Sequence, residues 1–288
     1  MSIKQRLPLL GTIQLVAFPA FAYSRVMRII SWNVNGIRAI EKKGFISWLS
    51  ADAPDMLCLQ ETKSNPTQLS EELVNIKDST GQPYHVYWAC AKKAGYSGVA
   101  IYTREKPLDV HTLGVSDFDN EGRVLMAEYE KFTLISAYFP NSQDAGARLD
   151  YKLAFCSAIL EKCSDLVAKG RRLILCGDYN IAHEAIDLAR PKSNEGNPGY
   201  LPEERAWMDV FTNAGFADTF RRQHPGETGH YSWWSYRMRA REKNVGWRID
   251  YHCVDEAFMP AVTKSFIRPD ILGSDHCPVE LQLELGKE

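Results

Sequence analysis

Six segments of the sequence end in side chains that can bind a metal ion or transfer a proton. Each follows a run of apolar and β-branched residues that is typical of a buried strand. The polar residues at the six ends are Asn33 with Asn35, Glu61, Tyr138 with Asn141, Asp178 with Asn180, Asp250, and Asp275 with His276. One polar strand end is ordinary, since Asp and Asn are common turn formers. Six of the same character indicate that the strands share one edge and that their polar ends converge on a single cleft.

The chemistry of this set is metal-assisted hydrolysis. Glu61 and a few more oxygen donors suit Mg²⁺, which takes few protein ligands and keeps water and substrate phosphate. Asp250 could orient the imidazole of His276, as in the pairs that transfer protons. Asp178 and Asn180, on one side of a turn, could hold an attacking water. The sequence has no serine or cysteine in a nucleophile elbow and no glycine-rich phosphate loop, so attack by water is favoured over a covalent intermediate.

Short strands and a few helices must position these groups. Ten runs predict strands, at 28–33, 55–60, 84–91, 97–103, 123–129, 132–139, 172–177, 230–235, 247–254 and 278–284. Four helices are predicted, at 148–169, from Pro202 to near Gly215, at 41–50 and at 68–77. This content predicts an α/β fold in which two sheets pack face to face with helices outside.

The composition and the N-terminus set the limits of the fold. The 288 residues are 45% hydrophobic, which is enough for one large core. No linker or repeat interrupts residues 27–288, which we therefore expect to form a single domain. Residues 1–26 are expected to lie outside it, as a mis-assigned start before Met27 or, alternatively, as a targeting peptide. No segment is long and apolar enough to span a membrane convincingly.

The seven cysteines indicate the redox environment of the protein. Their number is odd and no Cys-x-x-Cys pair exists, so they are expected to be buried free thiols in a reducing compartment. A cytoplasmic protein is therefore predicted, associated with the nucleoid if the source is bacterial. A structural zinc site is not expected, because no Cys/His cluster has suitable spacing.

Six ordered motifs resemble one family, the exonuclease III type of AP endonuclease in the endonuclease/exonuclease/phosphatase superfamily. They read Ser-Trp-Asn-Val-Asn-Gly, Leu-Gln-Glu-Thr-Lys, Tyr-Phe-Pro-Asn, Gly-Asp-Tyr-Asn-Ile-Ala-His, Lys-Asn-Val-Gly-Trp-Arg-Ile-Asp-Tyr and Gly-Ser-Asp-His-Cys-Pro. The resemblance runs from Met27 to about Leu285. It implies a four-layer α/β sandwich, with two mixed sheets packed face to face and flanked by helices.

The resemblance also implies an activity. The protein would cleave the phosphodiester 5′ to abasic sites in duplex DNA, with 3′–5′ exonuclease and 3′-end-trimming activity. It would use Mg²⁺, with Mn²⁺ as an alternative, and act as a monomer on duplex DNA that carries abasic sites or blocked 3′ ends. It would have no membrane partner.

The resemblance assigns roles by position. Residues that would hold the metal are Asn35, Glu61, Asp178, Asn180, Asp275 and His276, with Glu61 as the main ligand. Residues that would serve the reaction are Tyr138, Asp178, Asn180, Asp250 and His276, with Asn33 supporting the phosphate and the metal shell. Asp178 would position or deprotonate the attacking water. His276, its ring held by Asp250, would contact the scissile phosphate.

The wider superfamily also includes sphingomyelinases and inositol polyphosphate phosphatases, so the catalytic motifs alone do not identify the substrate. Further segments narrow the choice of substrate. Trp233 and Trp247 resemble the apolar residues that pack around a flipped-out abasic sugar. Core tryptophans are the alternative. The predicted DNA contacts are completed by Asn141, Asn194, Asn197 and Arg237.

A basic run accompanies these DNA-contact segments. The net charge is −2, so binding to DNA requires basic residues concentrated on one face. Candidates are Arg221, Arg222, Arg237, Arg239, Arg241, Lys243 and Arg248. An ordinary solvated face is the alternative. Two other functions stay open at this point: a phosphatase or secreted nuclease of the superfamily, and a DNA-binding or redox-interaction module without catalysis.

Overall fold

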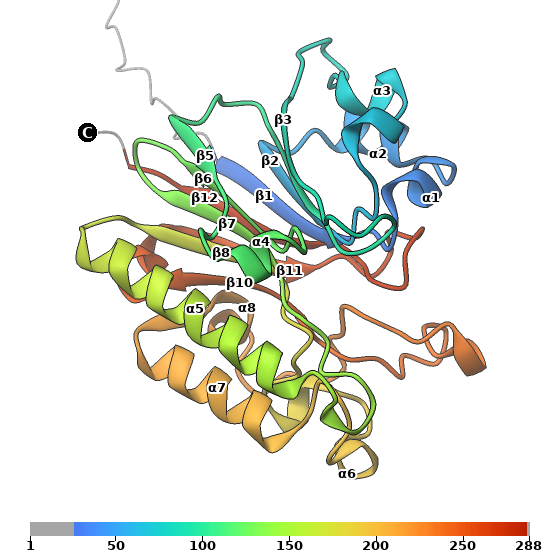
Figure 1. The fold of residues 1–288 in the computed structure, drawn as a ribbon, viewed down its shortest axis with the longest axis vertical. Coiled ribbons are helices and arrows are strands. Elements are labelled where there is room, and N and C mark those ends of the chain that lie inside the picture. The colour runs from blue at the N-terminus through green and yellow to red at the C-terminus, as the bar shows by residue number, and fades with distance from the viewer. Residues whose placement is uncertain (1–25, 287–288) are drawn as a thin grey trace, which may run out of the picture.

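Two six-stranded sheets face each other in the computed structural model, and helices cover their outer faces (Figure 1). The structure describes residues 26–286, so the predicted N-terminal extension lies outside the described residues apart from Val26. The predicted four-layer α/β sandwich is confirmed. Within residues 26–286, no helix is both long and apolar enough to cross a membrane.

The first sheet carries the first two predicted motifs at one edge. Its strands, in spatial order, are β11 (Val262–Ile267), β12 (Val279–Glu284), β1 (Val26–Asn33), β2 (Met56–Gln60), β4 (Val99–Thr103) and β3 (His85–Ala89). β1 and β2 are parallel, with Asn33 opposite Gln60. Parallel strands end at the same edge, so Asn33 and the residue after Gln60 are neighbours.

The second sheet carries three more motifs at the matching edge. Its spatial order is β5 (Asp109–His111), β6 (Val124–Glu128), β7 (Thr133–Tyr138), β8 (Leu173–Asp178), β10 (Asp250–Asp255) and β9 (Phe216–Asp218). β7 and β8 are parallel, with Tyr138 opposite Asp178. β10 runs antiparallel to β8, and its first residue, Asp250, also lies opposite Asp178. One register therefore aligns three predicted site residues.

Helices form the outer layers. α5 (Leu149–Ala168) and α7 (Pro202–Asn213) cover the second sheet, and α1 (Ile37–Glu41), α2 (Phe45–Asp52) and α3 (Glu71–Val74) lie beside the first (Figure 1). The remaining short helices are α4 (Ser116–Asp119), α6 (Pro191–Asn194) and α8 (Thr219–Gln223). The 3₁₀ turns are η1 (Pro66–Gln68), η2 (Asp144–Gly146), η3 (Ala185–Asp187), η4 (Arg237–Arg239) and η5 (Glu256–Ala261).

The apolar stripe of α5 explains its place in the fold. Phe155, Ile159 and Cys163 recur at helical spacing and are fully buried against outward-facing residues of β7 and β8. Gly170, with a φ of 81°, follows the end of the helix in the left-handed conformation that glycine adopts without strain. The predicted helix at 148–169 is therefore confirmed.

The predicted strand at 230–235 is wrong. Trp233 makes only isolated bridges, to Trp247 and to His276. Backbone partners change along this segment: the Trp234 N–H donates to the Asp275 carbonyl, whereas the Trp233 N–H donates to the Trp247 carbonyl. Single bridges of this kind do not extend into a ladder along residues 230–235.

Other boundaries differ more modestly. The strand predicted at 247–254 begins only at Asp250, and β5, β9 and β11 were not predicted. The helix predicted at 41–50 is observed as α2, which begins after Gly44, whose φ is 91°; α1, which ends at Glu41, was not predicted. The helix predicted at 68–77 is reduced to α3.

Candidate active site

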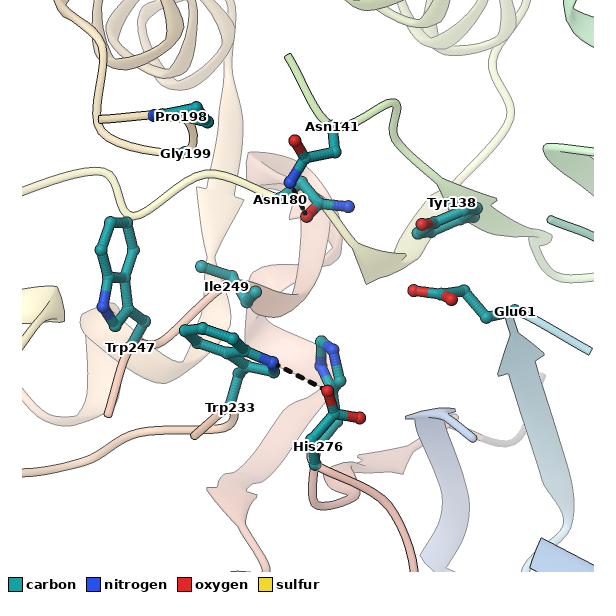
Figure 2. Close-up of a pocket in the computed structure, with 11 residues that line it drawn as sticks. Glu61, Tyr138, Asn141, Asn180, Pro198, Gly199, Trp233, Trp247, Ile249 and His276 are labelled. Atoms are coloured by element: carbon teal, nitrogen blue, oxygen red, sulfur yellow. Dashed lines mark hydrogen bonds between the residues drawn. The ribbon is translucent and has the colours of Figure 1, made fainter. Parts of the chain in front are cut away.

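A pocket of about 240 Å³ opens where the polar ends of both sheets meet (Figure 2). The predicted site residues that line it are Glu61, Tyr138, Asn141, Asn180, Trp233, Trp247, Asp275 and His276. Sequence reasoning missed its other lining residues, Pro198, Gly199 and Ile249. The predicted convergence of strand ends on one cleft is therefore observed.

Asn33 joins the two halves of the site. Its side-chain amide donates to Glu61 Oε1 at 2.9 Å and to Asp178 Oδ2 at 2.8 Å. Glu61 follows a strand of the first sheet and Asp178 ends a strand of the second. Because Asn33 is fully buried, this bridge sets the spacing of the two carboxylates.

An oxygen-rich cluster suited to a cation lies beside this bridge. Glu61, Asp178 and His276 offer ligand atoms that all lie within 4.8 Å of one another. The Lys63 ammonium donates to Asn35 Oδ1 at 2.5 Å and lies 2.6 Å from Glu61 Oε2. A positive charge thus already contacts two of the predicted metal ligands, which shows that the donor set suits a cation.

The surroundings of Glu61 and Asp275 favour the ionised form of both carboxylates. Burial alone would raise the pKa of Glu61, but the Lys63 charge and the Asn33 amide hold it below its usual value. Burial also opposes ionisation of Asp275, yet His276 and Asn35 lower the pKa of Asp275. The Asn35 amide donates to Asp275 Oδ1 at 3.0 Å, so the predicted ligands Asn35 and Asp275 lie side by side. Lys63 was not assigned from the sequence, although it follows Glu61 by two residues.

His276 is held by a buried relay of hydrogen bonds. Its Nδ1 lies 2.8 Å from Asp250 Oδ2, which also accepts a bond from the Ser232 hydroxyl at 2.7 Å. A carboxylate oxygen only accepts, so Nδ1 carries the proton. Nε2 then points toward Asp178, 3.9 Å from Oδ2. Ser232 was missed because a lone serine in a predicted strand gives no signal of this role.

Neighbouring carboxylates control the charge of this imidazole. Burial opposes the positive charge, but Asp250, followed by Asp178, raises the pKa of His276 to about 10. His276 is therefore an imidazolium over the physiological range. A fixed positive charge at the pocket wall can bind a phosphate oxygen.

Replacing Asp250 with Asn should remove this effect. The imidazolium loses its main favourable partner while burial continues to oppose its charge, so the pKa of His276 should fall from about 10 toward the ordinary value of about 6.5. An NMR titration of the His276 ring measures it. The matched control is Asp209→Asn, since Asp209 Oδ1 lies 2.7 Å from the Nε2 of His183, a different histidine. An unchanged His276 titration in Asp250→Asn would contradict the assignment.

Asp178 is positioned to exchange a proton near neutral pH. It is almost fully buried, and burial, with added repulsion from Asp250 and Glu61, raises its pKa to about 7 against the opposing effect of His276. The Asn180 N–H donates to Asp178 Oδ1 at 2.8 Å. The side chain of Asn180 donates to Asp178 Oδ2 at 3.3 Å and accepts from Asn141 at 3.2 Å. Asn180, Asn141 and Asp178 thus form one connected group.

Several backbone conformations at the site are strained. Asn35, Glu61, Lys63 and Asn180 have φ between 47° and 52°, a region that non-glycine residues seldom adopt. Such strain is common at functional sites, where the surrounding structure enforces it.

Tyr138 presents a neutral hydroxyl. Burial, followed by repulsion from Glu61 and Asp178, raises the pKa of Tyr138 well above its usual value. The hydroxyl therefore keeps its proton and can donate a hydrogen bond. The Arg123 guanidinium lies 5.0 Å from the ring centroid and donates to the Tyr138 carbonyl at 3.0 Å. Arg123, which is buried, was also missed from the sequence.

The tryptophans form one side of the pocket. Trp233 and Trp247 meet edge to face with centroids 6.2 Å apart, and each backbone N–H donates to the other's carbonyl at 2.9 Å. The Trp233 indole donates to Asp275 Oδ2 at 3.2 Å. Both rings face the cavity (Figure 2). They are half-buried wall residues, not core residues.

Three predicted DNA contacts lie outside the pocket. Asn194 donates to the Arg190 carbonyl, and Asn197 donates to Asn194 Oδ1 at 3.0 Å, on the loop that leads to Pro198. Arg237 is exposed in η4, on the segment around residue 240 that projects from the body of the fold (Figure 1). Their roles remain predictions.

The predicted basic face is partly wrong. Arg248 is buried: its Nε donates to Asp187 Oδ1 at 2.9 Å, and its Nη2 lies 2.7 Å from Asp218 Oδ2. Arg221 turns to the same Asp187 at 2.6 Å. These two arginines are structural, because a buried charge needs a partner of opposite sign. Of the other five, Arg222 and Arg239 pair with exposed acidic residues, and Arg241 donates to three backbone carbonyls.

Comparisons with known proteins agree with one another. The model of the Endonuclease/Exonuclease/phosphatase family matches residues 30–276. The exodeoxyribonuclease of Bacillus subtilis (strain 168) is 44% identical over 261 residues, covering 90% of this chain and 100% of that protein. DNA repair nuclease APEX1 of Danio rerio is 43% identical, covering 89% of this chain and 82% of that protein. The crystal structure of the AP endonuclease LMAP from Leishmania major aligns with a TM-score of 0.80 at 28% identity, covering 91% of this chain and 89% of that chain.

Proposed function

Since this chain belongs to the endonuclease/exonuclease/phosphatase family, we propose that it is a DNA repair hydrolase of the exonuclease III type. It cleaves the phosphodiester 5′ to abasic sites in duplex DNA and also acts at 3′ ends, as a 3′–5′ exonuclease and in trimming blocked ends. One observation carries the proposal: a single pocket joins the acidic cluster and the His276 relay to an apolar wall of two tryptophans. The names of the exodeoxyribonuclease and repair-nuclease relatives support it.

The metal ion we propose is Mg²⁺, with Mn²⁺ as the alternative. Glu61 would be its main ligand, and Asn35, Asp275, Asp178 and Asn180 would complete the set. His276 belongs to the candidate set only in its neutral form, because an imidazolium has no free lone pair for a metal. Oxygen donors with room for water and phosphate are the environment that Mg²⁺ prefers. When bound, a divalent ion neutralises charge on the phosphate and on the leaving oxygen.

The protein's own groups have separate tasks in this proposal. Asp178, whose pKa is raised to about 7, accepts a proton from the attacking water, which Asn180 helps to orient. His276, kept positive by Asp250, donates a hydrogen bond to a phosphate oxygen, as does the neutral hydroxyl of Tyr138. Asn33 holds the carboxylates of both sheets in register.

Selectivity for abasic sites is proposed to come from the shape of the pocket wall. An extruded sugar without a base can lie against Trp233 and Trp247, and a base still attached to that sugar would meet the same two rings. Asn141, Asn194, Asn197 and Arg237 are proposed contacts to the flanking DNA.

The proposal needs only one copy of the chain. We propose a monomer built from one domain at 27–288, in which the residues named above make up the site. Among the described residues, all seven cysteines are free, and six are buried, which supports a reducing, cytoplasmic location.

Incision of a labelled duplex with one abasic analogue tests the function. With Mg²⁺ we expect a nick only at the abasic position, and with EDTA we expect none, because the carboxylate cluster then lacks its metal. An intact duplex of the same sequence is the control. Absence of incision, or equal degradation of both duplexes, would point to another substrate of the superfamily.

A further inference from the structure

A fully buried ion pair lies behind the pocket, among residues to which no role has been given above. Lys152 of α5 and Glu204 of α7 have no exposed side-chain surface, and Nζ lies 2.7 Å from Oε1. Both charges lose their hydration, so such a pair contributes little net stability, and apolar replacements of similar size are often neutral or stabilising. The presence of a buried ion pair at this position therefore needs a reason other than a contribution to the stability of the fold.

Three loops are hydrogen bonded to this pair. Lys152 Nζ donates to the backbone carbonyl of Asn180 at 2.6 Å. The hydroxyl of Ser142, which follows Asn141, donates to the Glu204 carboxylate. The Leu201 N–H donates to Glu204 Oε2 at 2.9 Å, directly before α7. The pair is thus a shared anchor for the loop after β7, the loop after β8 and the loop before α7.

These same loops supply one wall of the pocket. Asn141, Asn180, Pro198 and Gly199 lie together on the side opposite His276 in Figure 2. The Ala182 N–H donates to the Gly199 carbonyl at 2.8 Å, which ties the second loop to the third. None of these four lining residues belongs to a helix or a strand, so their places depend on such anchors.

We propose that Lys152 and Glu204 are positioning residues for the reaction. They do not line the pocket but hold Asn180 beside Asp178 and keep Asn141 and Gly199 in place. The inference rests on the proposed function for its activity readout. Displacement of a catalytic group by about 1 Å can lower a rate about 100-fold, so loss of the anchor should be visible in kcat.

The test is the double variant Lys152→Met/Glu204→Gln, which removes both charges and leaves no lone buried charge. We expect kcat on the abasic duplex to fall about 10- to 100-fold with KM changed less than about 3-fold, because the groups displaced act on the reaction more than on DNA binding. The thermal midpoint should stay within about 5 °C of wild type. Amide hydrogen exchange should rise at 139–148, 179–184 and 195–201, a readout that needs no substrate.

Two further variants keep the test decisive. Asp255→Asn is the matched control: this buried carboxylate accepts from the Leu173 N–H at 2.7 Å at the opposite end of β10, so its loss should lower stability and leave kcat unchanged. Ser142→Ala removes one anchor bond without touching either charge, and should lower kcat about 3- to 10-fold even if the double variant does not fold.

The outcomes separate the inference from the proposed function. If wild type incises the abasic duplex and both the double variant and Ser142→Ala match its kcat, the positioning role is wrong. If wild type does not incise, the proposed function fails, and exchange rates then decide the inference. Unchanged exchange in the three loops would overturn it.

Discussion

Replacing Asp178 with Asn should lower kcat for abasic-site incision by about 10⁴-fold. The carboxylate accepts hydrogen bonds from Asn33 and Asn180, and a carboxamide would turn an N–H₂ group toward one of these donors. The amide also cannot take a proton from water. Single-turnover cleavage of the abasic duplex measures the loss.

DNA affinity separates this effect from a loss of folding. The substitution removes a negative charge next to the phosphate site, so the Kd for abasic duplex, measured by gel shift in EDTA, should be unchanged or lower. Asp255→Asn makes the same chemical change on the other end of the sheet and should retain full cleavage. Incision by Asp178→Asn at more than about a tenth of the wild-type rate would remove Asp178 from the proton-accepting role.

Glu61→Gln should produce the second largest effect. We expect kcat to fall at least about 100-fold and half-maximal activity to need a higher Mg²⁺ concentration. Loss of an outer partner of a metal site commonly costs 10- to 100-fold in affinity or activity, and loss of a direct ligand should cost at least as much. The Gln side chain also weakens the contact with Lys63, because a neutral oxygen replaces an anionic one. A Mg²⁺ titration of cleavage rate gives both quantities.

A buried carboxylate elsewhere in the same sheet is the matched control. Glu280 on β12 accepts from Arg28 at 2.8 Å, so Glu280→Gln removes the same charge without touching the pocket. We expect its Mg²⁺ requirement to equal that of wild type. A Glu61→Gln protein with a wild-type Mg²⁺ curve would show that the metal is held elsewhere.

The layout of the site was predictable because strand ends carry positional information. Asn33 and Glu61 follow buried runs that the sequence reveals, and parallel pairing of β1 with β2 brings those ends together. The same holds for Tyr138 and Asp178 on β7 and β8. The α/β sandwich was predictable from the number of strands, because ten apolar runs of strand length need two packed sheets to bury them.

Contacts between residues far apart in the chain could not be predicted from the sequence, because they depend on how the loops fold against each other. Ser232 lies beside Asp250 because the segments around Trp233 and Trp247 exchange backbone hydrogen bonds. The same exchange occurs where the sequence predicted a strand at 230–235. Arg248 looked like part of a charged face, yet its partner Asp187 lies 61 residues away. A run of charges in sequence does not report the direction in which each side chain points, and that direction decides whether it meets DNA or an internal carboxylate.

The position of β12 has a consequence for synthesis of the protein. This strand, close to the C-terminus, is inserted between β11 and β1, and the segment just before it carries Asp275 and His276. A ribosome must therefore translate as far as Glu284 before the first sheet can close, and as far as His276 before the proposed catalytic histidine exists. Chains released early, by a nonsense codon or a broken message, lack both. A nuclease built in this order cannot assemble its proposed site before β12 and the segment preceding it have been made.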